Sequence, residues 1–375
     1  MGKSVMTVEF GTSKVICAIG RKRSRGRFEI VSLAQINYAG LKKGRWQELE
    51  LVPEVLKKTI KEAKTKAKQN PTSAYVGIPP CFCRVHCASS AMDIIGNNRV
   101  ITAEIVDRMM KNAQHFDVPD EYEMVHASSV YFKLDGQNLF IDPVGVEASH
   151  IEGQFAFIFA KKRFLYEAKT LLDVLSISIT AFKPEMLCQA LFLIPVEERD
   201  ASSVLLDIGF YDTSVSIIYG DTVIYSRVIP AGGAQITSDL SQVLDIDMES
   251  AERIKRRFSF ETTIYPQHVK ETVRQDGNII EVDKQMIAEI ILSRVDHLTH
   301  MIKTALNESH VELPETTKVY LTGAGISMMK GSAAYLEDNL GLTTILPQID
   351  ATNYSSPNFH NAIGLLDHVL SNEEG

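Results

Sequence analysis

Two stretches of the sequence place an acidic residue two positions before a glycine, where an apolar run ends. Glu9 precedes Gly11 in VMTVEFGTSKVICAIG, and Asp207 precedes Gly209 in SVLLDIGFYDTSVSIIYG. Backbone N–H groups of such a turn can donate to phosphate oxygens, and the acid can hold the water shell of Mg²⁺. One stretch alone is equally typical of an ordinary hairpin, but the pair favours a phosphate-binding cleft.

The two stretches repeat one unit, which consists of a strand, the acid-x-Gly turn, a second strand and a glycine. The acids and the first glycines are both 198 positions apart (207 − 9 and 209 − 11), whereas Gly20 and Gly220 are 200 apart (220 − 20). We therefore expect the second turn to be two residues longer. Another β-rich run follows each unit, at 27–36 and 222–229. The repeat predicts two similar α/β halves, with both turns pointing into the cleft between them.

A Gly-x-Gly turn follows an apolar strand in LTGAGISMMKG (321–331). We expect a helix to begin directly after this turn, with Ser327 as its N-cap. The free N–H groups of such a helix start suit an anion or another close ligand, although the motif by itself is weak evidence.

A basic helix is predicted for AERIKRR (251–257), with Asp247 as its N-cap. Glu252 and Lys255 are three positions apart and therefore share one face of this helix. That face could hydrogen-bond a ribose and a base edge, but a solvated ion pair would give the same pattern.

Hydrophobic periodicity and capping signals place the other elements. One helix is expected to end at Asn70-Pro71, and another to begin at the N-cap Thr102. The other expected elements are strands at 4–10, 14–20, 73–78, 123–133, 137–147 and 151–160 and helices at 164–175 and 184–193.

Composition narrows the class of protein. The chain has 375 residues, of which 45% are hydrophobic, and its net charge of −8 does not favour a nucleic-acid-binding protein. No apolar run reaches the roughly 20 residues of a membrane span, so we expect a cytoplasmic location. Five cysteines are an odd number for a disulfide framework. Cys81, Cys83 and Cys87 would face the same way on one strand, but a metal site would need a second Cys/His cluster.

The two acid-x-Gly turns, the basic helix and the Gly-x-Gly turn occur in the order found in the actin, heat-shock protein and sugar-kinase superfamily. Within that superfamily the chain resembles the FtsA family of bacterial cell-division proteins, over about residues 5–368. The resemblance rests on VHASSVYFKLDGQNLFIDPVGVEASHIEG (125–153), VIPAGGAQITSDLSQVL (228–244) and HNAIGLL (360–366), together with AERIK. The signature residues in the first of these segments are His126, Tyr131, Asp135-Gly136 and Asp142-Pro143-Val144-Gly145.

The resemblance implies an α/β fold that is actin-like (ribonuclease H-like), duplicated and two-lobed, with the inserted subdomain of FtsA that is also called SHS2. The final helix is expected to return to the first lobe. The implied subdomains are IA at 1–82 and 162–199 with the final helix 359–370, IC at 83–161, IIA at 200–245 and 283–358, and IIB at 246–282.

The resemblance also implies a ligand, ATP with Mg²⁺. Glu9 and Asp207 would hold the Mg²⁺ through water, and the turn at 323–325 would accept adenosine. A catalytic residue cannot be singled out, although members of the family place the residue that positions water near the helix at 184–193. The implied nucleotide-binding residues are Gly11, Thr12, Ser13, Lys14, Asp207, Gly209, Thr213, Gly232, Gly233, Glu252, Lys255, Gly323, Ala324 and Gly325.

Several residues depart from the family pattern in the phosphate turns. Glu9 stands where the family has Asp, and Phe210 and Tyr211 replace two glycines. Ser214 stands in place of a further Asp, for which Asp212 compensates only in part. Because glycine permits close approach of a phosphate and side chains obstruct it, we expect weak or absent ATP binding and turnover near background.

The implied function is that of a non-enzymatic or weakly hydrolytic protein that self-associates through IA and IC and tethers a cell-division or envelope assembly. An alternative is a type IV pilus assembly protein resembling PilM. A less favoured alternative is a small-molecule kinase or phosphatase, which would need a further catalytic acid near the cleft that the motifs do not show.

The implied partner is the acidic, apolar tail of FtsZ, or a similar acidic peptide, on subdomain IIB. Chains of this family usually end in an amphipathic membrane helix, whereas this one ends in the acidic SNEEG. We expect FHNAIGLLDHVL to pack onto IA, so this chain would bind no lipid directly and would reach the inner membrane through partners. The basic residues expected on IIB are Arg253, Arg256, Arg257, Lys270 and Arg274.

Overall fold

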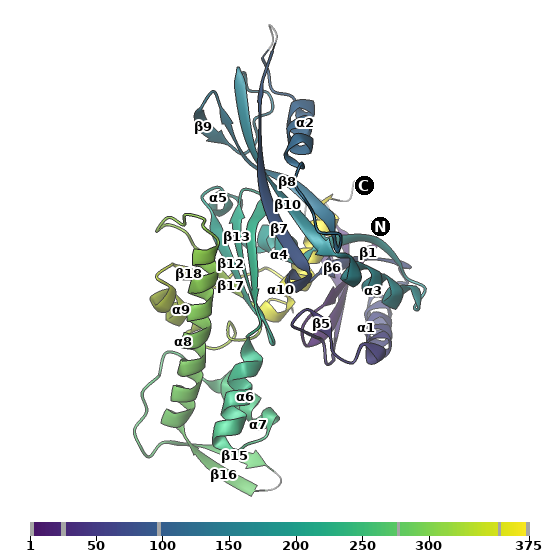
Figure 1. Ribbon diagram of the computed structural model, residues 1–375. Coiled ribbons are helices and arrows are strands. Elements are labelled where there is room, and N and C mark those ends of the chain that lie inside the picture. The colour runs from purple at the N-terminus through teal and green to yellow at the C-terminus, as the bar shows by residue number, and fades with distance from the viewer. Residues whose placement is uncertain (1–3, 24–27, 96–98, 276–277, 352–353, 373–375) are drawn as a thin grey trace.

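The computed structural model describes residues 4–23, 28–95, 99–275, 278–351 and 354–372 (Figure 1). The molecule has two lobes, each built on a five-stranded sheet, and a third sheet that projects from the junction between them (Figure 1). In the basic sequence RKRSRGR (21–27), the residues after Arg23 lie outside the described part of the chain.

The sheet of the first lobe has apolar residues on both faces, and helices cover both of them. Met6 and Val8 of β1 belong to the core under α1 and α3, whereas Val5 belongs to the core under α10. Side chains alternate across a strand, so this continuous apolar run must be covered twice. The sheet has the order β11-β6-β1-β2-β3, with β1 (Ser4–Phe10), β2 (Lys14–Lys22), β3 (Phe28–Asn37), β6 (Ser73–Ile78) and β11 (Ser178–Pro184). Its helices are α1 (Val52–Ala67), α3 (Lys162–Asp173), α4 (Glu185–Leu193), the short α5 (Val196–Arg199) and α10 (His360–Asn372).

The second lobe repeats this plan and adds a small unit at its far end, as Figure 1 shows. Its sheet has the order β14-β13-β12-β17-β18, with β12 (Ser203–Ile208), β13 (Thr213–Tyr219), β14 (Thr222–Ile229), β17 (Val319–Thr322) and β18 (Thr344–Ile345). The helices are α6 (Gly233–Leu244), α7 (Met248–Arg257), α8 (Lys284–Glu308) and α9 (Ser332–Leu340), and the hairpin is β15 (Lys270–Gln275) with β16 (Asn278–Asp283).

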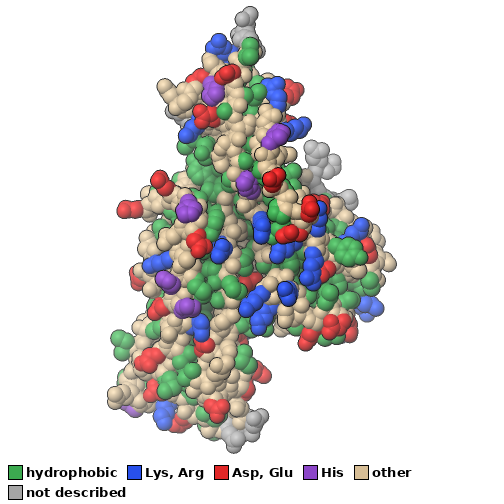
Figure 2. All heavy atoms as spheres, viewed as in Figure 1, with side chains coloured by type: hydrophobic (Ala, Val, Ile, Leu, Met, Phe, Trp, Pro, Cys, Tyr) green, Lys and Arg blue, Asp and Glu red, His purple; other side chains and the backbone are tan. Residues whose placement is uncertain are grey.

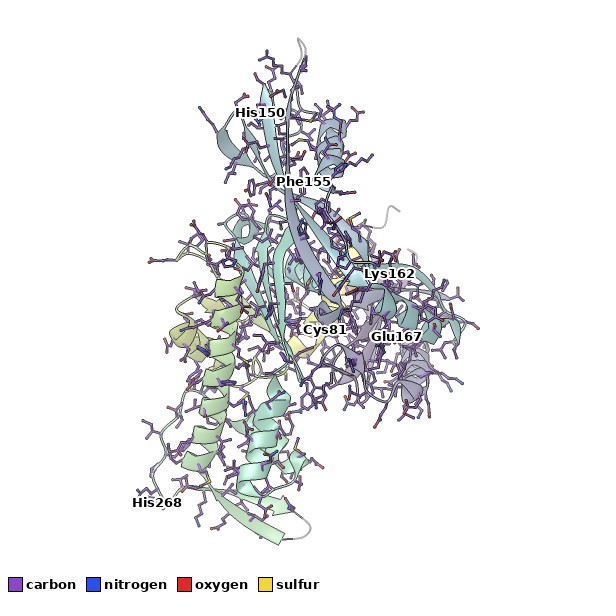
Figure 3. The ribbon with its side chains drawn as sticks, viewed as in Figure 1. Cys81, His150, Phe155, Lys162, Glu167 and His268 are labelled. Atoms are coloured by element: carbon purple, nitrogen blue, oxygen red, sulfur yellow. The ribbon has the colours of Figure 1, made fainter. Side chains whose placement is uncertain are left out.

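The third sheet forms the inserted subdomain. It packs α2 over an aromatic core that includes Phe155 of β10 (Figure 3). Its order is β7-β10-β8-β9, with β7 (Cys83–Asp93), α2 (Ala103–Ala113), β8 (Tyr122–Leu134), β9 (Gln137–Phe140) and β10 (His150–Lys161).

The two acid-x-Gly turns have the same length, contrary to the expectation of a longer second turn. The Gly11 N–H donates to Lys14 O, and the Gly209 N–H donates to Asp212 O, both at 2.9 Å. Each turn is followed by an antiparallel strand, so the predicted duplication of a three-strand meander is present.

The two-residue difference between the halves lies after the turns. Gly20 is inside β2, whereas Gly220 follows β13 in a turn with a φ of 57°. These two glycines are therefore not equivalent, and their spacing does not report the length of the turns.

Two of the three predicted N-caps are confirmed, Thr102 and Asp247. Thr102 Oγ1 accepts from the Ile105 N–H at 3.4 Å, and Asp247 Oδ1 accepts from the Ser250 N–H at 2.7 Å. Such caps satisfy N–H groups that lack a partner in the first helical turn.

The prediction of a helix directly after the Gly-x-Gly turn was wrong. Ser327 does not cap a helix, because its hydroxyl donates to Gly323 O within an irregular loop. The Met329 N–H donates to Ile326 O in a further turn, and α9 begins only at Ser332.

The expected strand 137–147 is also shorter than predicted and ends at Phe140. Pro143 cannot donate to a strand ladder, and Asp142 Oδ1 accepts from the Val144 N–H in a local turn.

Cys81 does not share a strand with Cys83 and Cys87, because it lies in a 3₁₀ turn of residues Pro80–Phe82 near the junction of the lobes (Figure 3). In the described part of the chain, no three or more His, Cys, Asp or Glu side chains are arranged so that they could hold a metal ion directly.

The final helix α10 packs onto the first lobe, as predicted. Its apolar residues contact β1, β2 and α4 and are almost fully buried. A Cβ at Gly20 would lie 2.7 Å from Leu366 Cδ2, so the helix and strand are in close contact. No helix among the described residues is long and apolar enough to cross a membrane. The buried apolar residues of α10 are Ile363, Leu365, Leu366, Val369 and Leu370.

Candidate nucleotide cleft

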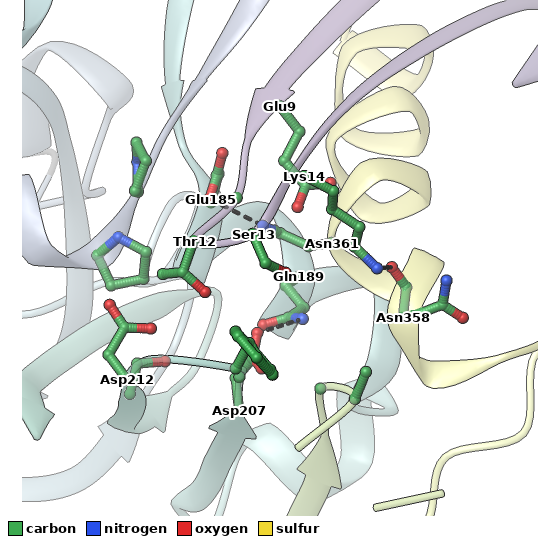
Figure 4. Close-up of a pocket in the computed structure, with 18 of the residues that line it drawn as sticks. Glu9, Thr12, Ser13, Lys14, Glu185, Gln189, Asp207, Asp212, Asn358 and Asn361 are labelled. Carbon is green, nitrogen blue, oxygen red and sulfur yellow. Dashed lines mark hydrogen bonds between the residues drawn. The ribbon is translucent and has the colours of Figure 1, made fainter. Parts of the chain in front are cut away.

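The two acid-x-Gly turns meet at one cavity between the lobes (Figure 4). The backbone N of Tyr211 lies 3.5 Å from Thr12 Oγ1, so the turns approach each other directly. The cavity has a volume of about 120 Å³. Pockets for drug-sized ligands are typically about 300–1,000 Å³, so the cleft is closed in this conformation.

Four carboxyl groups line this cavity, two from each lobe. Glu9 and Asp207 were expected there, and Glu185 and Asp212 join them. Burial raises the pKa of Glu9 to about 7, an effect that the Lys14 ammonium opposes and the Asp207 carboxyl reinforces. Burial and the nearby Asp207 raise the pKa of Asp212 to about 7 as well. Burial also raises the pKa of Glu185 and that of Asp207. The cavity is therefore a site that disfavours concentrated negative charge.

Neighbouring amides orient two of the four carboxyl groups. Asn361 Nδ2 donates to Glu185 Oε2 at 2.8 Å, and Gln189 Nε2 donates to Asp207 Oδ2 at 3.0 Å. The Glu185 side chain packs directly against the backbone of Gly77. A Cβ at Gly77 would lie only 2.3 Å from Glu185 Oε1, so a larger residue there would displace the carboxyl group. Within the described residues, no hydrogen-bond partner is found for Glu185 Oε1 or for Glu9 Oε2. These two buried oxygens are the groups that a hydrated cation would satisfy.

The first turn offers to the cavity a lysine ammonium group and backbone N–H groups that lack acceptors among the described residues. Lys14 lines the cavity and donates through Nζ to Asn358 O at 3.1 Å. Burial lowers the pKa of Lys14, although the Glu9 and Asp207 carboxyl groups counteract this effect. The N–H groups of Thr12 and Ser13 have no acceptor within the described part of the chain, so they could donate to an anion.

The second turn offers fewer donors than the sequence suggested. The Gly209 N–H is used within the turn itself, as described above. The Thr213 hydroxyl is buried and donates to Ala231 O at 2.7 Å, so it does not reach the cavity.

The two aromatic residues of the second turn point in different directions. Their ring centroids are 4.7 Å apart, in an edge-to-face arrangement. Phe210 lines the cavity, and Lys255 Nζ lies 5.7 Å from its ring centroid. Tyr211 is not part of the cavity lining, and Lys42 Nζ lies 5.3 Å from its ring centroid. The pair therefore bridges α7 of the second lobe and the first lobe through two cation–π contacts.

Lys42 is held in place by a short hairpin of β4 (Leu41–Lys42) and β5 (Arg45–Trp46). Trp46 Nε1 donates to Glu167 Oε2 of α3 at 2.9 Å, and Figure 3 labels Glu167 on that helix. Gly40 precedes the hairpin with a φ of 60°, and a Cβ there would lie 1.8 Å from Thr12 O. The hairpin is therefore fixed to the first phosphate turn.

The glycine turns expected to hold adenosine pack directly against the second phosphate turn. The Gly325 N–H donates to Ile208 O at 2.7 Å, and the Gly233 N–H donates to Gly209 O at 3.0 Å. A Cβ at Gly233 would lie 2.9 Å from Gly325 Cα, which leaves no room for a purine between these turns.

The ion pair on the basic helix is confirmed, with Lys255 Nζ 2.6 Å from Glu252 Oε2. The Lys255 side chain is only 2% exposed, so the pair is not the solvated one that the sequence left open. Thr237 Oγ1 also donates to Glu252 Oε2, and Lys255 Nζ donates to Gly233 O. This network joins α6 to α7 and does not line the cavity.

The structure thus brings part of the predicted set together. Sequence reasoning missed Glu185, Gln189, Asn358 and Asn361. A signal exists for the first two, because they are four apart on the helix expected near the reactive water. The predicted residues that line the cavity are Glu9, Gly11, Thr12, Ser13, Lys14, Asp207, Gly209, Gly323 and Ala324. Those outside its lining are Thr213, Gly232, Gly233, Glu252, Lys255 and Gly325.

The fold and the cleft define an actin-like protein. Solved structures with this arrangement include a PilM–PilN type IV pilus biogenesis complex, with a TM-score of 0.66, 16% identity and 98% coverage of both chains. Another is MreB 5 of Spiroplasma citri bound to AMPPNP, with a TM-score of 0.56, 12% identity and coverage of 96% of this chain and 94% of that one.

Sequence comparisons identify the family. The profile described as "Cell division protein FtsA" matches residues 204–364, and that of the "SHS2 domain inserted in FTSA" matches 84–159. Cell division protein FtsA of Pseudomonas aeruginosa is 24% identical over 90% of this chain and 81% of its own length. That of Bacillus subtilis is 23% identical over 98% of this chain and 83% of its own length. The chain belongs to the FtsA family.

Proposed function

We propose that this protein acts in cell division as an FtsA-type actin-like scaffold, which associates with itself and tethers a division or envelope assembly to the membrane through partners. The observation that carries this proposal is the inserted four-stranded sheet at the junction of the lobes, which coincides with the SHS2 match at 84–159. The pilus-assembly alternative is weaker, because the likeness to PilM concerns the fold at 16% identity.

The proposed subdomains IA, IC, IIA and IIB follow the boundaries given above. In this scheme the first-lobe sheet is IA, the inserted sheet is IC, the second-lobe sheet is IIA, and α7 with the β15–β16 hairpin is IIB. We propose that IA of one molecule meets IC of the next in a polymer. The inserted sheet supports this, because its end with β9 and α2 extends beyond both lobes (Figure 1).

The proposed ligand is ATP with Mg²⁺, bound weakly or not at all. The residues around the carboxyl groups fit the phosphate end, because two buried oxygens lack partners and two N–H groups of the first turn are free. The adenosine end does not fit in this conformation, because Gly233 and Gly325 are in contact. Binding would require these turns to separate, which costs part of the binding free energy. We accordingly propose no ATPase activity or only a weak one.

The proposed partner site is subdomain IIB, which would bind the tail of FtsZ or a similar acidic peptide. Arg253, Arg256 and Arg257 are exposed, but each has an acidic neighbour within the protein. Arg256 contacts Glu252 at 2.9 Å, and Arg257 lies 3.5 Å from Glu271. Exposed pairs of this kind contribute little stability, so an incoming acidic peptide could exchange with them.

We expect Arg256→Glu with Arg257→Glu to weaken binding of an FtsZ tail peptide about tenfold at low salt, because two favourable charges become unfavourable. Fluorescence anisotropy of the labelled peptide measures this change. Arg108→Glu with Lys111→Glu on the exposed face of α2 is the matched control, with the same change in net charge on the inserted subdomain. Unchanged peptide binding by the IIB variant would refute the proposed site on IIB. Self-association is a separate property, and its absence in the wild-type protein would refute the proposed scaffold function.

We propose a location at the cytoplasmic face of the inner membrane, reached through partners and without direct lipid contact by residues 1–375. The apolar residues of α10 are already buried against the first lobe. Co-sedimentation with anionic vesicles at physiological salt should therefore leave the protein in the supernatant. Pelleting with the vesicles would contradict this proposal.

A further inference from the structure

A groove on the outer side of the first lobe lies between α1 and the segment that follows α3. It has a volume of about 730 Å³, which is within the typical range of ligand and peptide pockets, about 300–1,000 Å³. One wall carries four lysines of α1, and the other is formed by residues 174–177. Lys and Arg side chains also gather over the first lobe on the face that Figure 2 shows.

The lysines of this wall form one stripe. Lys57, Lys61, Lys64 and Lys68 are spaced by four, three and four residues, so they lie along a single face of the helix and its cap. Like charges at such spacings disfavour a helix by a few tenths of a kcal/mol per pair. This arrangement is therefore not explained by the stability of α1.

The charges of the stripe are unpaired. No carboxylate in the described part of the chain lies within ion-pair distance of any of the four lysines. On other faces of the same helix, Lys58 pairs with Glu54 at 2.8 Å and Lys66 pairs with Glu62 at 2.7 Å. The IIB side chains Arg253, Arg256, Arg257 and Lys270 are paired as well. The unpaired positive charge of α1 therefore lies on the groove.

The groove also has an apolar part. Ile60 and Ile177 form its floor, and Leu175 is half-buried beside them. Val174 remains 68% exposed at the rim. Because Ile60 and Ile177 are already buried, an occupant would gain mainly from packing apolar side chains against Val174 and Leu175 while its charges meet the lysine stripe.

We propose that this groove binds a short acidic peptide in which acidic and apolar residues alternate. Neighbouring lysines of the stripe are about 4.5–6 Å apart along the helix, and alternate residues of an extended chain are about 6.6 Å apart. Acidic side chains at alternate positions therefore lie opposite successive lysines, and the intervening side chains face the floor. The site is shallow, and the apolar side chains beside its lysine stripe favour a peptide with both acidic and apolar residues over a purely anionic membrane surface.

The probe for this site is a fluorescein-labelled peptide of four Glu-Leu repeats, and its binding is measured by anisotropy at about 50 mM salt. Lys61→Gln with Lys64→Gln should weaken binding about tenfold, since each ion pair contributes a few-fold. Lys58→Gln with Lys66→Gln removes the same charge from the paired faces and should change binding less than twofold. Val174→Asn, which leaves the charge unaltered, should weaken binding about threefold. Circular dichroism melts establish that the variants are folded.

Several outcomes would overturn the proposal. One is an equal loss of peptide affinity in the Lys61/Lys64 and Lys58/Lys66 variants. Another is that a Gln-Leu repeat peptide binds as tightly as the Glu-Leu peptide. A third is that Val174→Asn leaves the affinity unchanged. A membrane is the occupant instead if wild type pellets with vesicles of one part phosphatidylserine to three parts phosphatidylcholine and only the Lys61/Lys64 variant does not. A second copy of the chain is the occupant if sedimentation velocity shows that this variant alone loses self-association.

Discussion

Phe210→Gly is expected to raise the affinity of the protein for ATP–Mg²⁺ at least tenfold. The Phe210 ring lines the cavity between the lobes, and the cavity is too small for a nucleotide in this conformation. Removing the ring enlarges the phosphate end of the cavity and permits closer approach of the backbone. It also removes the contact with Lys255, so the second turn can separate more easily from α7. Isothermal titration calorimetry measures the change.

Tyr211→Gly is the matched control for this experiment. It removes a ring of similar size from the neighbouring position, but that ring contacts Lys42 and is not part of the cavity lining. We expect its affinity for ATP–Mg²⁺ to stay within about threefold of wild type. Tight binding by wild type, with no gain in the Phe210 variant, would show that the ring does not obstruct the site.

The location of the cleft could be predicted because it depends on local patterns. Short-range sequence patterns are strong for apolar strands and for tight turns with an acid and a glycine. The repetition of this pattern at Glu9 and Asp207 predicts two facing halves. The turn length could not be inferred from Gly20 and Gly220, because a glycine inside a strand and a glycine in a turn are identical in sequence.

The rest of the site depends on tertiary packing. Glu185 reaches the cavity because β11 pairs beside β6, which brings the start of α4 next to Gly77. The Phe210 ring lies at the cavity and contacts Lys255 of the second lobe, whereas the Tyr211 ring lies outside the cavity lining and contacts Lys42 of the first lobe. These relationships connect segments far apart in the chain, so single-sequence periodicity contains no signal for them.

The same packing places four carboxyl groups in a small buried cavity, and this has a consequence for stability. The pKa of Glu9 is about 7 in the folded protein against an ordinary value of 4.5, and that of Asp212 is about 7 against 3.8. At a pH between the ordinary and the raised pKa of each group, the folded state binds more protons than the unfolded state. The free energy of unfolding therefore decreases as the pH rises from about 4 to 7, and the full penalty is present above pH 7.

Glu9→Gln is expected to stabilise the protein by about 3 kcal/mol at pH 8 and to change it little near pH 4, because the pKa of Glu9 is raised from 4.5 to about 7 and one pKa unit corresponds to about 1.4 kcal/mol. Lys14, Asp207, Glu185 and Asn361 surround this carboxyl group, and only Lys14 carries a charge that favours its ionised form. Urea titrations in EDTA at both pH values measure the effect, with the exposed Glu123→Gln as control. Added Mg²⁺ should stabilise wild type at pH 8 more than the Glu9 variant, because the cation offsets the same buried charge. Equal stabilisation of both proteins by Mg²⁺ would show that Glu9 is not part of the cation site. If the Glu9 variant were less stable than wild type at pH 8, the buried carboxylate would not be destabilising as proposed.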